Sequence, residues 1–147
     1  AIAHERDDRI KRLAGKIDRV LVDAPCSGLG TLRRSPDLKW RQTPTTVAAQ
    51  AQLQQAILHS AARLLKPGGR LVYATCSLLP DENEAVAEAF GAAHPDFEAE
   101  AVRDVLTTAR VDKPDELCAG EGGRWLRLWP HRHLTDGFFA AVWRKKA

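Results

Sequence analysis

Three cysteines are the residues of this sequence with the widest chemical use: Cys26, Cys76 and Cys118. Their number is odd, they stand far apart, and the sequence has no Cys-x-x-Cys pair. A disulfide framework needs a denser and even set, and a structural zinc site normally shows at least one such pair. Two interpretations are left, namely small buried thiols or thiols that act as nucleophiles.

The segments that precede Cys26 and Cys76 are predicted to be strands. Ile17–Asp23 combines β-branched residues and Leu with a carboxylate at its end, which is typical of a buried strand. Arg70–Thr75 is a second apolar strand and ends directly on Cys76. Ligands of parallel α/β sheets bind beyond the carboxyl ends of the strands. We therefore expect these two thiols to lie close together on the ligand-binding rim.

A long helix is predicted to connect these strands. Thr43 followed by Pro44 is a strong helix start, because a capping hydroxyl precedes a proline at the first helical position. Apolar residues then recur at helical spacing through Leu65, and Lys66–Gly69 is expected to stop the helix. The order strand, loop, helix and strand favours a parallel α/β sheet.

The remaining segments are expected to complete the sheet. Acidic residues after Pro80 place negative charge on the first turn of a helix that runs to about Ala93. Residues 103–123 are interpreted as a loop, and residues 7–13 as a short helical turn stopped by Gly15. Short strands are expected at Phe97–Ala101, Trp125–Trp129 and Phe138–Trp143, the last two as a closing hairpin.

Composition sets the class of protein. The chain has 147 residues, of which 44% are hydrophobic and 28% charged, which is typical of a globular domain and excludes a disordered or fibrous chain. A net charge of +3 does not by itself indicate a nucleic-acid binder. A membrane-spanning run and a signal peptide are both lacking, so a cytoplasmic protein is expected. The sequence contains no Met, which indicates a fragment or a processed product.

Several motifs occur together in a fixed order. Asp23–Gly28 reads DAPCSG, and Thr75–Ser77 reads TCS, with fifty residues between the two cysteines. This ordered set resembles the Sun/nucleolar-protein family of S-adenosylmethionine-dependent RNA (cytosine-5) methyltransferases, and the bacterial members that modify small-subunit ribosomal RNA are the most similar. Three further segments agree with the family: Arg33–Arg41 (RRSPDLKWR), Lys66–Ser77 (KPGGRLVYATCS) and Leu134–Ala140 (LTDGFFA).

The resemblance implies an α/β fold of the Rossmann-like class I methyltransferase type, with a mostly parallel sheet and a terminal antiparallel hairpin. Of the family's strand order 3-2-1-4-5-7-6, this chain would keep 4-5-7-6. Residues 1–147 are thus expected to be the C-terminal portion of one catalytic domain, without the first strands, the Gly-rich cofactor motif and the N-terminal RNA-binding region. Ile17–Asp23 would then be an open edge prone to self-association. The isolated chain is expected to bind S-adenosylmethionine weakly and not to methylate RNA.

The resemblance also assigns chemical roles. Carbon 5 of cytosine is a poor nucleophile, so a thiolate first adds to carbon 6, and a base later removes the proton at carbon 5. The family's pattern implies that Cys76 is the nucleophile and that Cys26 assists product release, whereas the spacing alone does not rank them. It further implies that Asp23 acts as a base or contacts the cofactor, with Pro25 beside the cofactor as well. A loop-capping Asp23 is the alternative.

A basic cluster follows the predicted catalytic loop. Phosphate contact and base stacking are expected there, with ribosomal RNA as the partner, and a merely solvated loop is the alternative. Gly28 and Gly30 are expected to let the backbone approach the substrate closely. No metal partner is expected, because no set of ligands has suitable spacing. The cluster holds four cations and one aromatic residue: Arg33, Arg34, Lys39, Trp40 and Arg41.

Other functions stay open at this point. A tRNA-directed cytosine-5 methyltransferase would carry similar motifs, and a non-catalytic RNA-binding module would need only the basic cluster. An amino-methyltransferase typically has Asp or Asn, then Pro-Pro and an aromatic residue, where this chain ends its motif with Cys26. A thiol-redox protein would normally show Cys-x-x-Cys.

Overall fold

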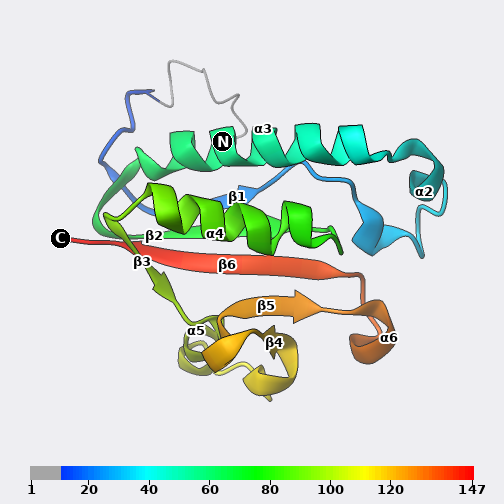
Figure 1. Ribbon diagram of the computed structural model, residues 1–147. Helices are drawn as coiled ribbons and strands as arrows, with labels where there is room; N and C mark the ends of the chain where they lie inside the picture. The colour runs from blue at the N-terminus through cyan, green and yellow to red at the C-terminus, as the bar shows by residue number, and fades with distance from the viewer. Residues whose placement is uncertain (1–10) are drawn as a thin grey trace.

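The computed structural model describes residues 11–147 (Figure 1). Its strands are β1 (Ile17–Asp23), β2 (Leu65–Thr75), β3 (Phe97–Glu100), β4 (Cys118–Ala119), β5 (Trp125–Leu128) and β6 (Phe138–Lys145). Its α-helices are α2 (Leu38–Arg41), α3 (Pro44–Ala62), α4 (Glu84–Ala93), α5 (Val102–Thr108) and α6 (Pro130–His133). Single-turn 3₁₀ helices occur at Leu29–Thr31, Pro80–Glu82, Pro114–Leu117 and Glu121–Gly123. Most of the turn expected over 7–13 lies outside the described residues.

One sheet carries all the described strands. β1 pairs in parallel with β2, and β6 pairs antiparallel with β2. Along its other edge, β6 pairs with β5 near its start and with β3 near its end, both antiparallel. The path β1-β2-β6-β3 therefore matches the expected order 4-5-7-6. The sheet is mixed rather than mostly parallel in its pairings, because β6 runs against β1, β2, β3 and β5.

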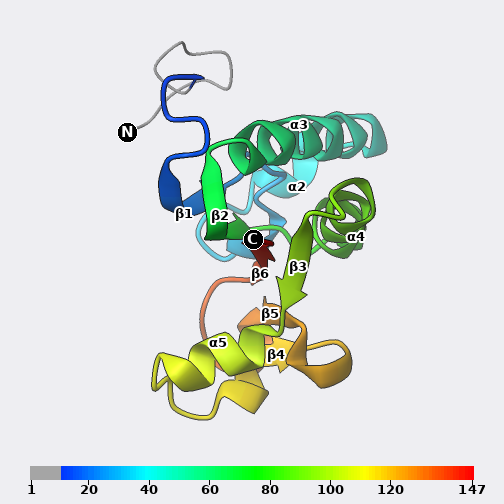
Figure 2. The ribbon, with the colours of Figure 1, turned by 90° about the vertical axis from the view of Figure 1, so that its left-hand side faces the viewer.

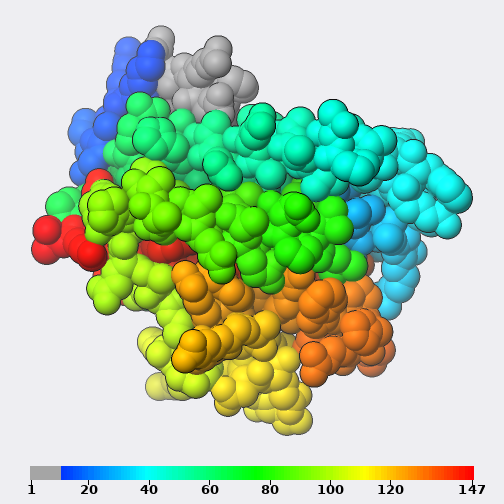
Figure 3. Space-filling model, viewed as in Figure 1, coloured from blue at the N-terminus to red at the C-terminus, as the bar shows by residue number. Residues whose placement is uncertain are grey.

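Helices α3 and α4 lie side by side on one face of the sheet (Figures 1 and 2), and their side chains cover this face in the space-filling view (Figure 3). Leu71, Tyr73 and Thr75 of β2 are fully buried, whereas the residues between them are only half-buried. Leu58 of α3 and Trp143 of β6 belong to the same apolar core. This packing fixes the central strand that ends on Cys76.

The connection from α3 to β2 differs from the expectation. Thr43 caps the helix as predicted, but α3 ends at Ala62 and β2 begins at Leu65. Leu65 is fully buried and pairs with Ile17 of β1, and the register then shifts before Arg19. A Cβ on Gly69 would lie 2.8 Å from the Leu65 side chain. The Lys-Pro-Gly-Gly segment is therefore an irregular part of the strand rather than a separate helix stop.

Two further expectations were wrong. β1 is not the buried strand that its residues predict: within the described residues it is the open edge of the sheet that the resemblance implies, where Leu21 is 67% exposed and Val22 is buried. Residues 103–123 are not a loop, since they hold most of α5, two 3₁₀ helices and β4. The seven residues of α5 bury only Val102, so the apolar periodicity that reveals a longer helix is lacking.

Candidate active site

The two thiols at the carboxyl ends of β1 and β2 meet, as predicted. Parallel pairing sets Asp23 beside Ala74, so the loops that leave the two strands start at the same edge of the sheet. The Sγ atoms of Cys26 and Cys76 are 3.4 Å apart, and both residues are half-buried. Cys118 lies instead on β4, beyond β6 and β5 in the strand order. Cys26 and Cys76, which follow the ends of parallel strands, are therefore adjacent, whereas Cys118 is not part of this pair.

The environment makes these thiols unequal. Hydrogen bonding from Cys26 lowers the pKa of Cys76 to about 7, against burial and the charges of Asp23 and Glu82, which raise it. The same contact, together with burial, raises the pKa of Cys26. The two thiols contact each other and therefore titrate as a pair. Cys76 is thus the more readily ionised of the two thiols.

A buried carboxylate, Glu82, connects the two cysteine loops. It accepts hydrogen bonds from the backbone N–H of Ser27 at 2.8 Å and from the hydroxyls of Ser27 and Ser77, each at 2.5 Å. Each serine directly follows one of the two cysteines. Glu82 is fully buried, and a buried charge without such donors would be costly. The carboxylate therefore holds the two loops together and with them the two sulfurs.

Helix α3 and strand β2 support this carboxylate. The Gln54 amide donates to Glu82 Oε1 at 3.2 Å and to the carbonyl of Pro25 at 2.9 Å. The Tyr73 hydroxyl has contacts of 3.0 Å with Gln54 Oε1 and 2.5 Å with the carbonyl of Glu82. Both side chains are fully buried. The carboxylate and its loops are thus fixed to the rigid core rather than to each other alone.

Close backbone packing positions Cys76 from the other side. The N–H of Gly30 donates to the carbonyl of Cys76 at 2.8 Å, and the N–H of Gly137 donates to the carbonyl of Gly30 at 2.8 Å. A Cβ on Gly30 would lie 2.3 Å from the Gly137 carbonyl oxygen and 2.6 Å from that of Cys76. Gly30 is therefore approached by the protein's own backbone, not by the substrate as expected. Gly28 has a φ of 72°, which glycine tolerates best.

The residues predicted to contact cofactor and RNA occupy the same rim but do not form one cluster. Asp23 and Pro25 are exposed at the end of β1. Arg34 forms an ion pair with the buried Asp136, which raises the pKa of Arg34. That contact ties the basic cluster to the segment before β6. Within the rest of the cluster, Arg33, Lys39 and Arg41 are exposed, and Trp40 is 81% exposed.

Comparison with known proteins decides the family. A family model described as "16S rRNA methyltransferase RsmB/F" matches residues 2–144. The chain belongs to this family. A probable ribosomal RNA small subunit methyltransferase B of Synechocystis is 47% identical over 88% of the chain and 27% of the relative. The ribosomal RNA small subunit methyltransferase B of Klebsiella pneumoniae is 54% identical over 80% of the chain and 27% of the relative.

A solved structure agrees with the RsmB/F assignment. NSun6 from Pyrococcus horikoshii, solved with SFG, superimposes with a TM-score of 0.72 at 30% identity over all of the chain and 34% of that protein. The Rossmann-like α/β fold implied by the motifs is thus confirmed, and S-adenosylmethionine is the cofactor of the family. The chain spans about a quarter to a third of the length of these RsmB/F relatives and structural neighbours.

Over residues 11–147, no three or more His, Cys, Asp or Glu side chains gather closely enough to hold a metal ion. In that same part of the chain, no helix is long and apolar enough to span a membrane.

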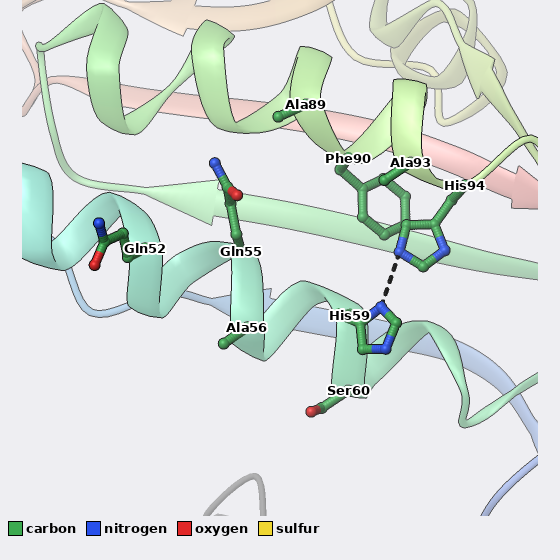
Figure 4. A pocket seen from close by; sticks show the side chains of 9 residues that line it. All are labelled: Gln52, Gln55, Ala56, His59, Ser60, Ala89, Phe90, Ala93 and His94. Carbon is green, nitrogen blue, oxygen red and sulfur yellow. Dashed lines mark hydrogen bonds between the residues drawn. The ribbon is translucent and has the colours of Figure 1, made fainter.

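A hollow of about 480 Å³ opens between α3 and α4, away from the thiols (Figure 4). His59 and His94 face each other across it, with Nδ1 of His59 3.3 Å from Nε2 of His94. The His94 ring stacks on Phe90 at a centroid distance of 4.3 Å. The pKa of His94 is lowered overall. Burial lowers it most, the neighbouring His59 and Lys145 also lower it, and Asp96 partly offsets them by raising it.

The lowered pKa of His94 predicts that the stability of the folded protein depends on pH. A folded-state pKa below the unfolded value of about 6.5 means that the unfolded chain binds the proton more readily. The contribution of His94 to stability is therefore complete above about pH 6.5 and is lost as the pH falls below it. We expect His94→Phe, which retains an aromatic ring on Phe90, to flatten the fall in thermal midpoint between pH 7 and pH 5. Replacing the exposed Glu88 with Gln is the control, and an unchanged slope in His94→Phe contradicts the assignment.

Three residues of this site were missed by the sequence analysis: Gln54, Glu82 and Asp136. Gln54 stands four residues before the buried Leu58 on the apolar face of α3, and a polar residue on a buried face signals a hydrogen-bonding role. Glu82 was counted only among the acidic residues on the first turn of a helix, but its side chain is fully buried. Asp136 belongs to the segment LTDGFFA, which carried the resemblance without a role of its own.

Proposed function

We propose that this chain carries the catalytic thiols of an S-adenosylmethionine-dependent enzyme that methylates carbon 5 of a cytosine in small-subunit ribosomal RNA. One observation supports the proposal most strongly: two thiols of unequal acidity lie 3.4 Å apart where two parallel strands end. A non-catalytic RNA-binding module would not need such a pair, and neither would an amino-methyltransferase. Membership of the RsmB/F family supports ribosomal RNA as the substrate.

The first step follows from the acidity of Cys76. Its thiolate adds to carbon 6 of the cytosine, and the electron pair of the 5,6 double bond makes carbon 5 nucleophilic. When bound, S-adenosylmethionine would supply an electrophilic methyl group on a sulfonium sulfur, and that sulfur would be released as a neutral thioether. With a pKa of about 7, Cys76 is about half ionised at neutral pH, so no separate base is needed to activate it.

The last steps regenerate the thiol. A base takes the proton from carbon 5, the double bond re-forms, and the Cys76 sulfur leaves carbon 6. We assign Cys26 to this release, because its sulfur lies 3.4 Å from that of Cys76 and its thiol proton would stabilise the departing thiolate. Asp23 is our candidate for the base or the contact to the cytosine edge, since its carboxylate is exposed and its charge reaches Cys76.

The residues at the end of β1 fit one side of the cofactor site. Asp23 and Pro25 are both exposed, so a carboxylate and a rigid backbone segment border the thiols on an accessible rim. The Pro25 carbonyl is held by Gln54, which keeps this rim in place. We therefore assign Asp23 and Pro25 to the cofactor's side of the active site, where the carboxylate would accept hydrogen bonds from the bound molecule.

The rim also offers a surface for RNA. A hollow of about 590 Å³ is lined by residues of both cysteine loops and of the α2–α3 junction, among them Leu29, Val47 and Leu79. Its apolar lining suits the face of a base, and Lys39 adds a cation at its edge. Trp40 presents an exposed ring beside Lys39, whose Nζ lies 4.8 Å from the ring centroid. These features support the basic cluster as the RNA contact.

Salt dependence tests this surface. We expect the triple replacement of Arg33, Lys39 and Arg41 by Gln to weaken RNA binding for every sequence and to reduce the salt slope by about 0.7–0.9 per lost phosphate contact. Trp40→Ala is expected to cost about 1–3 kcal/mol of binding with the slope unchanged, because stacking involves no counterion release. Filter binding across a salt series measures both. Arg63→Gln, an exposed cation at the other end of α3, is the control, and an equal effect there contradicts the assignment.

Methyl transfer tests the function itself. The full-length protein is incubated with labelled S-adenosylmethionine and unmodified small-subunit ribosomal RNA or tRNA transcripts, and the digested nucleosides are separated. We expect label in 5-methylcytidine from ribosomal RNA. Label only from tRNA favours the tRNA-directed alternative, and RNA binding without any label favours the non-catalytic module.

A further inference from the structure

The two catalytic thiols are close enough to react with each other. Their Sγ atoms are 3.4 Å apart, so forming a disulfide of about 2.05 Å requires an approach of about 1.4 Å. Both residues are half-buried, which leaves the sulfurs within reach of a small oxidant. Ser27 and Ser77, the residues that follow them, bind the same Glu82 carboxylate, so the two loops stay together when the substrate is absent.

We propose that Cys76 is a peroxide-reactive site for which Cys26 is the resolving thiol, and that the resulting disulfide reversibly stops methyl transfer. The effect on activity rests on the proposed function, because it requires that Cys76 be the nucleophile. Formation of the disulfide does not, since it depends only on the two sulfurs.

The chemistry is balanced with hydrogen peroxide as the oxidant. The Cys76 thiolate attacks one peroxide oxygen, the O–O bond breaks, and hydroxide leaves, which yields a sulfenic acid on Cys76. The Cys26 sulfur then attacks the Cys76 sulfur, the S–O bond breaks, and the Cys26 thiol proton leaves with the oxygen as water. Two thiols are oxidised to one disulfide, and the peroxide is reduced to two waters once the first hydroxide is protonated. An external dithiol reverses the reaction.

The site is selective among the three thiols. A thiolate with a pKa of about 7 is about half ionised at pH 7, whereas an ordinary thiol near 8.5 is about 3% ionised. The lower pKa also reduces intrinsic nucleophilicity, by about fivefold over this range. The gain in thiolate fraction exceeds this loss, which leaves Cys76 with a net advantage over an ordinary thiol. It is larger over Cys118, whose pKa is raised by burial.

Mass spectrometry of the full-length protein without RNA or cofactor tests the proposal. After hydrogen peroxide, the unfolded protein is alkylated under non-reducing conditions and digested. We expect a peptide that links Cys26 to Cys76 and has lost two hydrogens, and, of the three cysteines in this sequence, we expect only Cys118 to stay alkylatable. Dithiothreitol should restore all three thiols and the methyl transfer. Persistence of alkylatable Cys26 and Cys76 at peroxide doses that oxidise Cys118, or a link through Cys118, would overturn the proposal.

Two variants sharpen the result. In Cys26→Ser, Cys76 lacks its resolving partner and is expected to gain the mass of two oxygens as sulfinic acid. Cys118→Ser, the matched control outside the pair, is expected to form the disulfide as the wild type does. If the disulfide forms but methylation of cytosine is never detected, the proposed function fails and the dithiol reaction stands. If methylation occurs and is unaffected by the peroxide dose, the proposed switch fails alone.

Discussion

Cys76→Ala is expected to abolish covalent attachment to RNA and to reduce methyl transfer by at least about 10⁴-fold, because the thiolate that adds to carbon 6 is lost. Cys26→Ala is expected to act in the opposite sense on the adduct. Without the thiol proton that stabilises the departing Cys76 sulfur, the covalent complex should accumulate. A denaturing gel of the full-length protein with labelled RNA and S-adenosylmethionine shows both outcomes in adjacent lanes.

The third cysteine supplies the control. Cys118 lies on β4 and does not belong to the pair of Cys26 and Cys76. We therefore expect Cys118→Ala to form as little stable adduct as the wild type and to methylate RNA at the same rate. Thermal unfolding of all three variants checks that the fold is kept. Accumulation of adduct in Cys76→Ala with none in Cys26→Ala reverses the assigned roles.

Glu82→Gln is expected to lower kcat by about 10- to 100-fold with a smaller change in KM, because a displacement of the two sulfurs by about 1 Å costs this much in rate. The amide retains an acceptor for the Ser27 N–H but loses the charge that the two serine hydroxyls bind. That charge raises the pKa of Cys76, so its removal should also shift the pH midpoint of Cys76 alkylation downward. A merely structural defect would not produce that shift.

The exposed Glu88 on α4 is the matched control, since Glu88→Gln removes the same charge from solvent. Neither its kcat nor its alkylation midpoint should move. Glu82→Ala is expected to lose folding stability instead, because each buried donor left without a partner costs about 1–3 kcal/mol. An unchanged alkylation midpoint together with an unchanged kcat in Glu82→Gln contradicts a positioning role for Glu82.

The position of the thiol pair was predictable because it depends on topology alone. A strand that ends on Asp23 and another that ends on Thr75, joined by one helix, must place the following residues on the same rim if the strands are parallel. The connecting helix was predictable from the capping Thr43 and from the apolar residues that recur at helical spacing after it. Unequal acidity was not predictable, since it depends on a 3.4 Å contact that no spacing encodes.

The supporting network depends on side-chain direction, which short sequence windows do not specify. Glu82 stands where a helix-start carboxylate is usually solvated. Hydrogen bonds from the nearby Ser77, and from Ser27 and Gln54 in distant segments, hold it in the core instead. In the same way, Gly30 is required by contact with Gly137, more than a hundred residues away. Such long-range pairs appear only when the tertiary structure is known.

Identification of the cysteine that bonds to RNA tests the central claim most directly. The full-length wild-type protein is reacted with 5-fluorocytosine-bearing RNA and S-adenosylmethionine, which stalls after methyl transfer because carbon 5 has no proton to lose. The adduct is digested, and tandem mass spectrometry locates the nucleotide-bearing residue. We expect the nucleotide on Cys76. A nucleotide on Cys26, or no covalent link at all, contradicts it.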